Sequence, residues 1–184
     1  MIHRLRRRGS NVRPWWIGLL IALILVLPRA GSSNSDGEEG VKAAFIYNFA
    51  KFTEWPAANT DAPLLICSVG SQPLSGKLAL LHGRRVLGRE VHVRTQMRAE
   101  QWRDCRILFV SDGDTPRPKE VIAALGALSV LTVSDSEGFI HAGGMIGLKP
   151  QFGRIRFDIN LAAVRRSGLK LNSQMVDLAD EVLK

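Results

Sequence analysis

Three histidines in the body of the chain, His82, His92 and His141, are the first candidates for chemistry. Zinc sites usually place histidines or cysteines at short, fixed spacings, such as H-E-x-x-H on a helix or repeated C-x-x-C pairs. These histidines follow neither pattern, so a metal site would have to be assembled from distant segments. We therefore expect surface histidines or histidines with ordinary hydrogen-bond partners, and we predict no metal site.

Aspartates follow two of the predicted strands. Asp112 and Asp114 come after one apolar run and Asp135 comes after another. The carboxyl ends of parallel strands meet at one edge of a sheet, where α/β proteins place ligands. Carboxylates there could bind a cation or exchange protons, but turns and helix caps also favour aspartate after a strand. We expect the turn role.

A glycine-rich stretch, GSQPLSGK from Gly70 to Lys77, has the position of a phosphate-binding loop between a strand and a helix. It departs from that motif because five residues separate Gly70 from Gly76, and Leu78 follows where Ser or Thr would hold magnesium. An ordinary turn explains it. The chain also lacks the G-x-S-x-G nucleophile motif. We therefore predict no catalytic residue and no cofactor, and we do not expect an enzyme.

The two cysteines, Cys67 and Cys105, lie far apart and outside any C-x-x-C motif. In an exported protein such a pair favours one disulfide, whereas in the cytosol two buried thiols are expected. A bond closing a loop of about 38 residues would stabilise the fold by roughly 4 kcal/mol. We expect a structural role.

The positive charge of the chain is concentrated at its start. The formal net charge is +8, and residues 1–30 contribute six arginines and no acidic residue. The remainder is close to neutral, which removes most of the case for nucleic-acid binding. We expect no nucleic-acid partner.

The first 30 residues resemble a secretory signal, with basic residues to Arg13, an apolar run from Trp15 to Leu27, and small residues after Arg29. The apolar run is shorter than the about 20 residues that span a membrane. The pattern predicts export to the periplasm, with an uncleaved N-terminal anchor as the alternative. We expect a signal peptide or anchor at 1–30, a flexible linker at 31–40 and one domain at 41–184.

Several segments must position these side chains. Val41 to Pro56 has Val41, Ala44, Phe45, Phe49 and Phe52 at helical spacing, which predicts a helix buried on that face. The apolar runs predict buried strands, and Val91 with Val93 predicts a half-exposed one. The predicted strands are Leu64–Val69, Val91–Val93, Ile107–Val110 and Val130–Val133. The predicted helices between them are Ser71–Leu81 and Lys119–Leu128.

The last third predicts a hairpin and two helices. Met145–Lys149 and Arg154–Ile159 flank a tight connection at Pro150–Gly153, and one helix follows Asn160. Asn172 or Ser173 can cap a final helix that extends to Leu183. The predicted fold class is α/β: a single domain with a largely parallel or mixed sheet flanked by helices, a C-terminal antiparallel hairpin and two C-terminal helices.

Two aromatic residues near this hairpin are candidates for contact with a partner. Phe139 precedes the pair Gly143-Gly144, where the backbone can adopt positive φ or approach a neighbour closely. Its ring is either a core anchor, which we prefer, or an exposed contact. Phe152 lies in the predicted turn. We take Phe139 and Phe152 as candidate partner-binding residues.

The ordered motifs resemble those of the YfiR family of periplasmic regulators over about residues 41 to 181. The segments are VKAAFIYNFAKFTEWP, LLICSVG, CRILFVS, LTVSDSEGFIHAGGMI and RIRFDINLAAVRRSGLKLNSQMVDLA. The resemblance implies a single α/β domain. It also implies a disulfide, since Cys67 and Cys105 fall at cysteine positions of the family.

The resemblance further implies a periplasmic protein that binds and represses a membrane-bound signalling enzyme, in particular a diguanylate cyclase, and so lowers cyclic di-GMP. The implied partners are the periplasmic domain of that inner-membrane protein and an outer-membrane lipoprotein that competes for it. Independently of the resemblance, a second copy of the chain is a further candidate partner. The alternative is a periplasmic small-ligand sensor or solute-binding module, which a concave pocket with convergent polar groups would favour.

Overall fold

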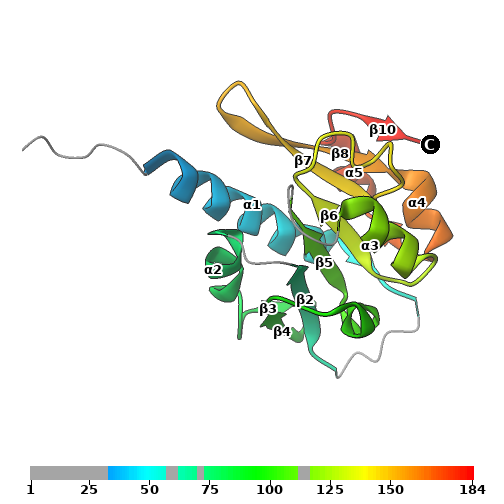
Figure 1. Ribbon diagram of the computed structural model, residues 1–184, viewed down its shortest axis with the longest axis horizontal. Helices are drawn as coiled ribbons and strands as arrows, with labels where there is room; N and C mark the ends of the chain where they lie inside the picture. Colours follow the sequence, from blue (N-terminus) through cyan, green and yellow to red (C-terminus); the bar gives the residue numbers. More distant parts are fainter. Residues whose placement is uncertain (1–32, 57–61, 70–72, 112–116) are drawn as a thin grey trace, which may run out of the picture. The chain divides into compact units, whose positions relative to one another are not determined.

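The computed structural model describes residues 33–56, 62–69, 73–111 and 117–184, which build a mixed sheet with helices on both faces (Figure 1). The leader predicted at 1–30 lies outside the described residues. The helices are α1 (Ser33–Phe52), α2 (Pro73–Ala79), the 3-10 helix η1 (Ala99–Asp104), α3 (Pro118–Leu125), α4 (Leu161–Arg166) and α5 (Ser173–Asp177).

The main sheet has eight strands in the order β10-β8-β7-β6-β5-β2-β4-β3. Its strands are β2 (Leu64–Val69), β3 (Arg85–Val86), β4 (Arg89–Arg94), β5 (Ile107–Val110), β6 (Leu131–Ser134), β7 (Ile146–Gln151), β8 (Arg154–Asn160) and β10 (Val182–Leu183). The central run from β4 to β7 is parallel, whereas β7 with β8 and β3 with β4 are antiparallel pairs. The short strands β1 (Thr53–Glu54) and β9 (Lys170–Leu171) pair separately. The predicted α/β fold class is confirmed.

Alternate residues of the central strands face opposite cores, because successive side chains of a strand point to opposite faces of the sheet. On β5, Ile107 and Phe109 join the core covered by α1 and α4, and Leu108 and Val110 join the core covered by η1 and α3. Both faces are therefore closed, which explains the nearly continuous apolar runs in the sequence.

Helix α1 begins earlier than predicted and buries a partly different face. Residues 33–40, expected as part of a flexible linker, are helical. Acidic residues near the start favour the positive end of the helix dipole, and Lys77 Nζ lies 2.7 Å from Asp36 Oδ1. The prediction of the buried face is wrong for Val41, Ala44 and Phe52, which are exposed. It is correct for Phe49, which is 2% exposed, and in part for Phe45, which packs against the core half-buried. The buried stripe contains Ala43, Ile46, Phe49 and Ala50.

The final helix is shorter than predicted. Of the two expected caps, Asn172 and Ser173, it is Asn172 that caps α5, with its Oδ1 accepting from Gln174 N at 2.8 Å, but the helix ends at Asp177. The expected continuation to Leu183 is wrong because the tail pairs with β8. Asp180 N donates to Phe157 O and Ile159 N donates to Glu181 O, both at 2.9 Å. Sheet hydrogen bonds replace the helical ones.

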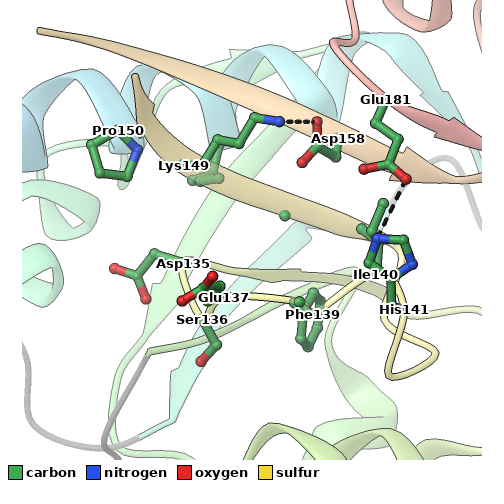
Figure 2. Close-up of a pocket in the computed structure, with 13 residues that line it drawn as sticks. Asp135, Ser136, Glu137, Phe139, Ile140, His141, Lys149, Pro150, Asp158 and Glu181 are labelled. Atoms are coloured by element: carbon green, nitrogen blue, oxygen red, sulfur yellow. Dashed lines mark hydrogen bonds and ion pairs between the residues drawn. The ribbon is translucent and has the colours of Figure 1, made fainter. Parts of the chain in front are cut away.

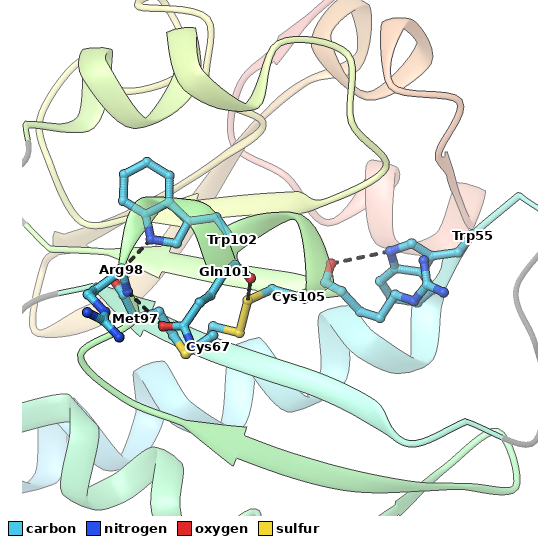
Figure 3. The surroundings of a disulfide bond; sticks show 8 residues. Trp55, Cys67, Met97, Arg98, Gln101, Trp102 and Cys105 are labelled. Carbon is cyan, nitrogen blue, oxygen red and sulfur yellow. Dashed lines mark hydrogen bonds between the residues drawn. A yellow bond between two sulfur atoms is a disulfide. The ribbon is translucent and has the colours of Figure 1, made fainter.

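The disulfide joins the sheet to the layer above it. Cys67 on β2 is bonded to Cys105, which directly follows η1, with Cα atoms 6.0 Å apart (Figure 3). Both residues are buried in the same core as Trp102, whose Nε1 donates to Met97 O at 3.1 Å. The bond thus joins the end of η1 to the sheet, and the predicted pairing of the two cysteines is found.

Candidate functional site

A cavity of about 500 Å³ lies beside the β7–β8 hairpin. Its lining comes from the loop 135–141 after β6, from residues 147–150 of β7, and from Asp158 and Glu181. Figure 2 shows Asp135 and Glu137 on one side of this space and Lys149 with Asp158 on the other. The cavity is therefore bounded by charged groups of both signs.

Lys149 and His141 at the cavity each lie next to carboxylates. Lys149 Nζ is 2.7 Å from Asp158 Oδ1 and 3.7 Å from Asp180 Oδ2. The hydrogen bond to Asp158 raises the pKa of Lys149, and the partial burial of the ammonium offsets this only in part. Elsewhere in the lining, His141 Nε2 lies 3.3 Å from Glu181 Oε1.

Asp135 connects this cavity to a second cluster of charges centred on Lys42. Lys42 is only 6% exposed, and its Nζ lies 3.0 Å from Asp135 Oδ2, 3.0 Å from Glu38 Oε1 and 3.2 Å from Glu39 Oε1. The ammonium of α1 is thereby joined to the end of β6, 93 residues away in sequence. Ser111 Oγ, just after β5, donates to Asp135 Oδ1 at 3.3 Å.

The surroundings of Lys42 favour its charged form. Burial alone would lower the pKa of the ammonium, but hydrogen bonds to Asp135 and Glu38 and the charges of Asp135 and Glu39 more than offset this, so the pKa is raised. A lysine acting as a general base needs a lowered pKa. The pKa shifts of Lys42 and Lys149 therefore favour roles in structure or in binding charged groups.

The expected position of the aspartates at the sheet edge is found for Asp135, but its ion pair with Lys42 goes beyond the turn role that was expected. Asp135 lies at the carboxyl edge of the sheet, beside Ser111 from the neighbouring strand. Asp112 and Asp114 lie outside the described residues, as does Gly70 of the glycine-rich stretch. The structure thus brings Asp135 to Lys42, a contact that the sequence analysis missed. Glu38 and Glu39, four and three residues before Lys42, were the available signal for an ion pair on one helix face.

Phe139 takes the buried alternative of the two that the sequence left open. Its ring is 2% exposed, and a Cβ on Gly144 would overlap the ring. Gly144 is therefore required for a close approach of backbone to side chain. A buried ring does not offer a surface to a partner, so the candidate partner-binding role of Phe139 is not retained.

Phe152 lies at the opposite extreme, with 97% of its surface exposed. It occupies the two-residue turn Phe152-Gly153 between the paired residues Gln151 and Arg154. Both turn residues have positive φ, 49° and 72°, which is the type I′ hairpin turn. Asparagine or glycine usually occupies the first position because larger residues are strained there.

The hairpin that carries Phe152 extends beyond its neighbour. Strand β6 pairs only with Ile146 and Gly147 of β7, so Leu148 to Gln151 have β8 as their partner in the sheet. Proline has no N–H to donate to a neighbouring strand. Pro150 is tolerated here because β6 does not extend along this part of β7 and needs no donor from it. The turn is thus displayed at the end of a two-stranded arm (Figure 1).

Within the described ranges, no helix combines the length and apolar character needed to cross a membrane.

Comparison with known proteins gives one family and one fold. A family model described as YfiR/HmsC-like matches residues 39–180. Among solved structures, the chain resembles a conserved domain protein from Vibrio cholerae O1 biovar eltor, with a TM-score of 0.50 and 8% sequence identity. That match covers 78% of this chain and 60% of the other, so this chain spans about three fifths of that protein. The likeness concerns the fold alone.

Proposed function

We propose, because this chain belongs to the YfiR/HmsC-like family, that it is an exported regulator that binds and represses a membrane-bound signalling enzyme. The enzyme class we infer is a diguanylate cyclase, so the protein would lower cyclic di-GMP. The partner surface is the outer domain of that inner-membrane enzyme, and an outer-membrane lipoprotein would compete for the same regulator. A second copy of the chain is a further partner.

The observation that carries a binding role is the display of Phe152. A fully exposed aromatic ring gains nothing from folding, and its positive φ is a strained conformation that costs about 1–3 kcal/mol. Such a residue is a typical anchor once a partner covers it, because aromatic side chains contribute most to protein interfaces. We propose that Phe152 contacts the partner.

The disulfide supports an oxidising location. Bonded cysteine pairs persist in the periplasm and are rare in the cytosol, where thiols are kept reduced. The bond between Cys67 and Cys105 therefore agrees with export and with the periplasm as the place of action. The signal-like leader remains a prediction from sequence.

The test is the level of cyclic di-GMP in a strain that lacks this protein. We expect a rise on deletion, and we expect the exported full chain to reverse it while a version without residues 1–30 does not. An unchanged level across several envelope stresses would refute repression of a cyclase.

The cavity favours one alternative function, a periplasmic sensor of a small ligand. Its volume of about 500 Å³ and its paired charges are suitable for a small polar molecule. Thermal unfolding of the purified protein with a library of small charged solutes tests this function. A solute that stabilises the wild type but not an Asp158→Asn variant would support it, and no such solute would count against it.

A further inference from the structure

Two histidines and a glutamate that the sequence separates meet beside strand β4. His82 lies in the turn after α2, and Glu90 and His92 lie on β4. One potential ligand atom from each residue lies within 4.8 Å of the other two. The imidazole rings of His82 and His92 stack with centroids 5.1 Å apart, and His92 Nε2 is 3.3 Å from Glu90 Oε1.

Rigid backbone holds this group. Glu90 and His92 are two residues apart on one strand, so their side chains point to the same face. The turn that carries His82 is tied to that strand, since Gly83 N donates to Val91 O at 2.9 Å and Val91 N donates to Arg84 O at 2.7 Å. The three side chains are therefore brought together by the fold, not by chance overlap of mobile segments.

We propose that His82, Glu90 and His92 form a binding site for a late divalent transition-metal ion, Zn²⁺ or Cu²⁺. Two imidazole nitrogens and one carboxylate oxygen are a ligand set that these ions favour. Three protein ligands leave a fourth position for water or for a side chain of a partner. His82 and Glu90 are exposed, so this position is accessible from solvent.

The surroundings select against harder cations. Mg²⁺ and Ca²⁺ prefer several oxygen ligands, and this group supplies a single carboxylate. Arg84 and Arg85 lie beside the group in sequence, and Arg85 pairs with Glu90 across the β3–β4 ladder. Positive charge there disfavours an ion held by electrostatic attraction alone, whereas imidazole binds late transition metals through its nitrogen lone pair.

Binding requires small side-chain adjustments. With metal–ligand distances from about 2.0 to 2.2 Å, ligand atoms of a tetrahedral site lie about 3.3 Å apart. Glu90 and His92 already have that spacing. Val93 N donates a long hydrogen bond, 3.3 Å, to His82 Nδ1. Metal binding requires this bond to break, because one ring nitrogen then binds the metal and the other carries the proton, so Nδ1 has no free lone pair for Val93 N. The bond is exposed, so water can replace it.

A plain ion pair would account for Glu90 and His92 but not for His82. His141 and Glu181 supply the comparison, because they form the same kind of pair, also 3.3 Å apart, and belong to no group of three potential ligands among the described residues. A His141→Gln variant is therefore a matched control for His82→Gln and His92→Gln.

The experiment is calorimetric titration of the full chain, purified without a polyhistidine tag and freed of metal, in a His3→Gln background that removes the histidine of the leader. We expect one Zn²⁺ or Cu²⁺ per chain and no comparable binding of Mg²⁺ or Ca²⁺. His82→Gln, His92→Gln and the nearly isosteric Glu90→Gln should each weaken binding at least about tenfold. His141→Gln should leave it unchanged.

The imidazole NMR signals provide a second readout on the same samples. Zn²⁺ should shift the signals of His82 and His92 and leave those of His141 in place. Equal affinity in wild type and in all three ligand variants would overturn the site, and so would loss of binding in His141→Gln. Because the test needs no membrane partner, its outcome is independent of the proposed regulation of a cyclase.

Discussion

At the scale of single residues, Lys42 shows how one side chain connects distant parts of the chain. It is buried, yet it reaches two carboxylates on its own helix and Asp135 at the end of β6. A buried cation is tolerated only when it is paired and hydrogen-bonded. Its removal leaves three carboxylates near one another without their shared cation.

We therefore expect Lys42→Met to reduce the free energy of unfolding by roughly 2 kcal/mol, less than for a fully buried pair because Glu38 is partly exposed. Urea unfolding at neutral pH measures this. Lys51→Met on the same helix is the control, since Lys51 is exposed and its hydrogen bond to Asn48 is long, at 3.4 Å. Equal stability of Lys42→Met and Lys51→Met would contradict the role of the cluster.

The raised pKa of Lys42 also predicts a dependence of stability on pH. Folding favours the protonated ammonium, so its contribution is full below the ordinary lysine value of 10.5 and is lost as the pH rises through the higher value of the folded state. The difference in unfolding free energy between wild type and Lys42→Met should therefore stay constant from neutral pH to about 10 and then shrink. A difference that shrinks below pH 9 instead would contradict this assignment.

Gly144 provides a second prediction at this scale. A methyl group there would overlap the buried ring of Phe139, so Gly144→Ala should lower the free energy of unfolding by about 1–3 kcal/mol. Gly40→Ala is the matched control, because Gly40 lies in α1 with open space around it, and alanine in a helix should stabilise by about 0.5–1 kcal/mol. Thermal unfolding should separate the two variants in opposite directions, and an unchanged Gly144→Ala would refute the close contact.

At the scale of elements, the sequence predicts best where one signal dominates. The apolar runs of β2, β5 and β6 were predicted because strands buried on both faces have a strong local pattern. The tight connection was predicted at Pro150–Gly153, but Pro150 and Gln151 belong to β7 and only Phe152 and Gly153 form the turn. Helix α1 was predicted as a helix, but its buried face was only partly correct: Phe49 is buried, whereas Val41 and Phe52 belong to a neighbouring, exposed stripe of similar spacing. The choice between two stripes depends on the sheet beneath, which local spacing does not contain.

The other features that the sequence did not predict depend on contacts between segments that are distant in sequence. The tail at Val182–Leu183 has helix-compatible residues, and only pairing with β8 makes it a strand. The pairing of Lys42 with Asp135 and of His82 with His92 likewise depends on how elements lie in space. The cavity is likewise lined by segments that are distant in sequence, so the sequence singled out Asp135 but not the groups that the fold brings next to it.

The disulfide between β2 and the end of η1 leads to a prediction about the stability of the fold. Replacing both cysteines by alanine should lower the free energy of unfolding by roughly 4 kcal/mol, because a loop of about 38 residues is no longer closed in the unfolded chain. Urea unfolding of Cys67→Ala/Cys105→Ala, beside oxidised wild type, measures the loss. Wild type treated with a reductant should lose stability to a similar extent, and a double variant as stable as the oxidised protein would contradict a stabilising bond.

At the scale of the whole molecule, the proposed regulator combines a rigid body with one exposed arm. The disulfide and the two cores fix the sheet, while the β7–β8 hairpin carries Phe152 away from it. The cavity lies beside this arm and includes Lys149, Pro150 and Asp158 from its strands. A ligand in the cavity and a partner on the turn would therefore act on the same two strands.

The β3–β4 hairpin has a turn of the same geometry and provides the control for the proposed role of Phe152. Leu87 and Gly88 connect β3 to β4 with positive φ values of 50° and 80°, and Leu87 is 66% exposed. Because asparagine suits the first position of such turns, Phe152→Asn and Leu87→Asn should both fold at least as stably as wild type. Phe152→Asn removes the exposed apolar side chain from the β7–β8 hairpin, whereas Leu87→Asn removes it from the β3–β4 hairpin.

The most direct measurement is cyclic di-GMP in the deletion strain complemented with wild type, Phe152→Asn or Leu87→Asn, with the amount of each protein in the periplasm determined by immunoblot. Our account predicts that wild type and Leu87→Asn restore a low level, whereas Phe152→Asn leaves it high at equal abundance. A Phe152→Asn protein that represses as wild type does would contradict the proposed contact. A level that no version changes would contradict the regulatory function itself.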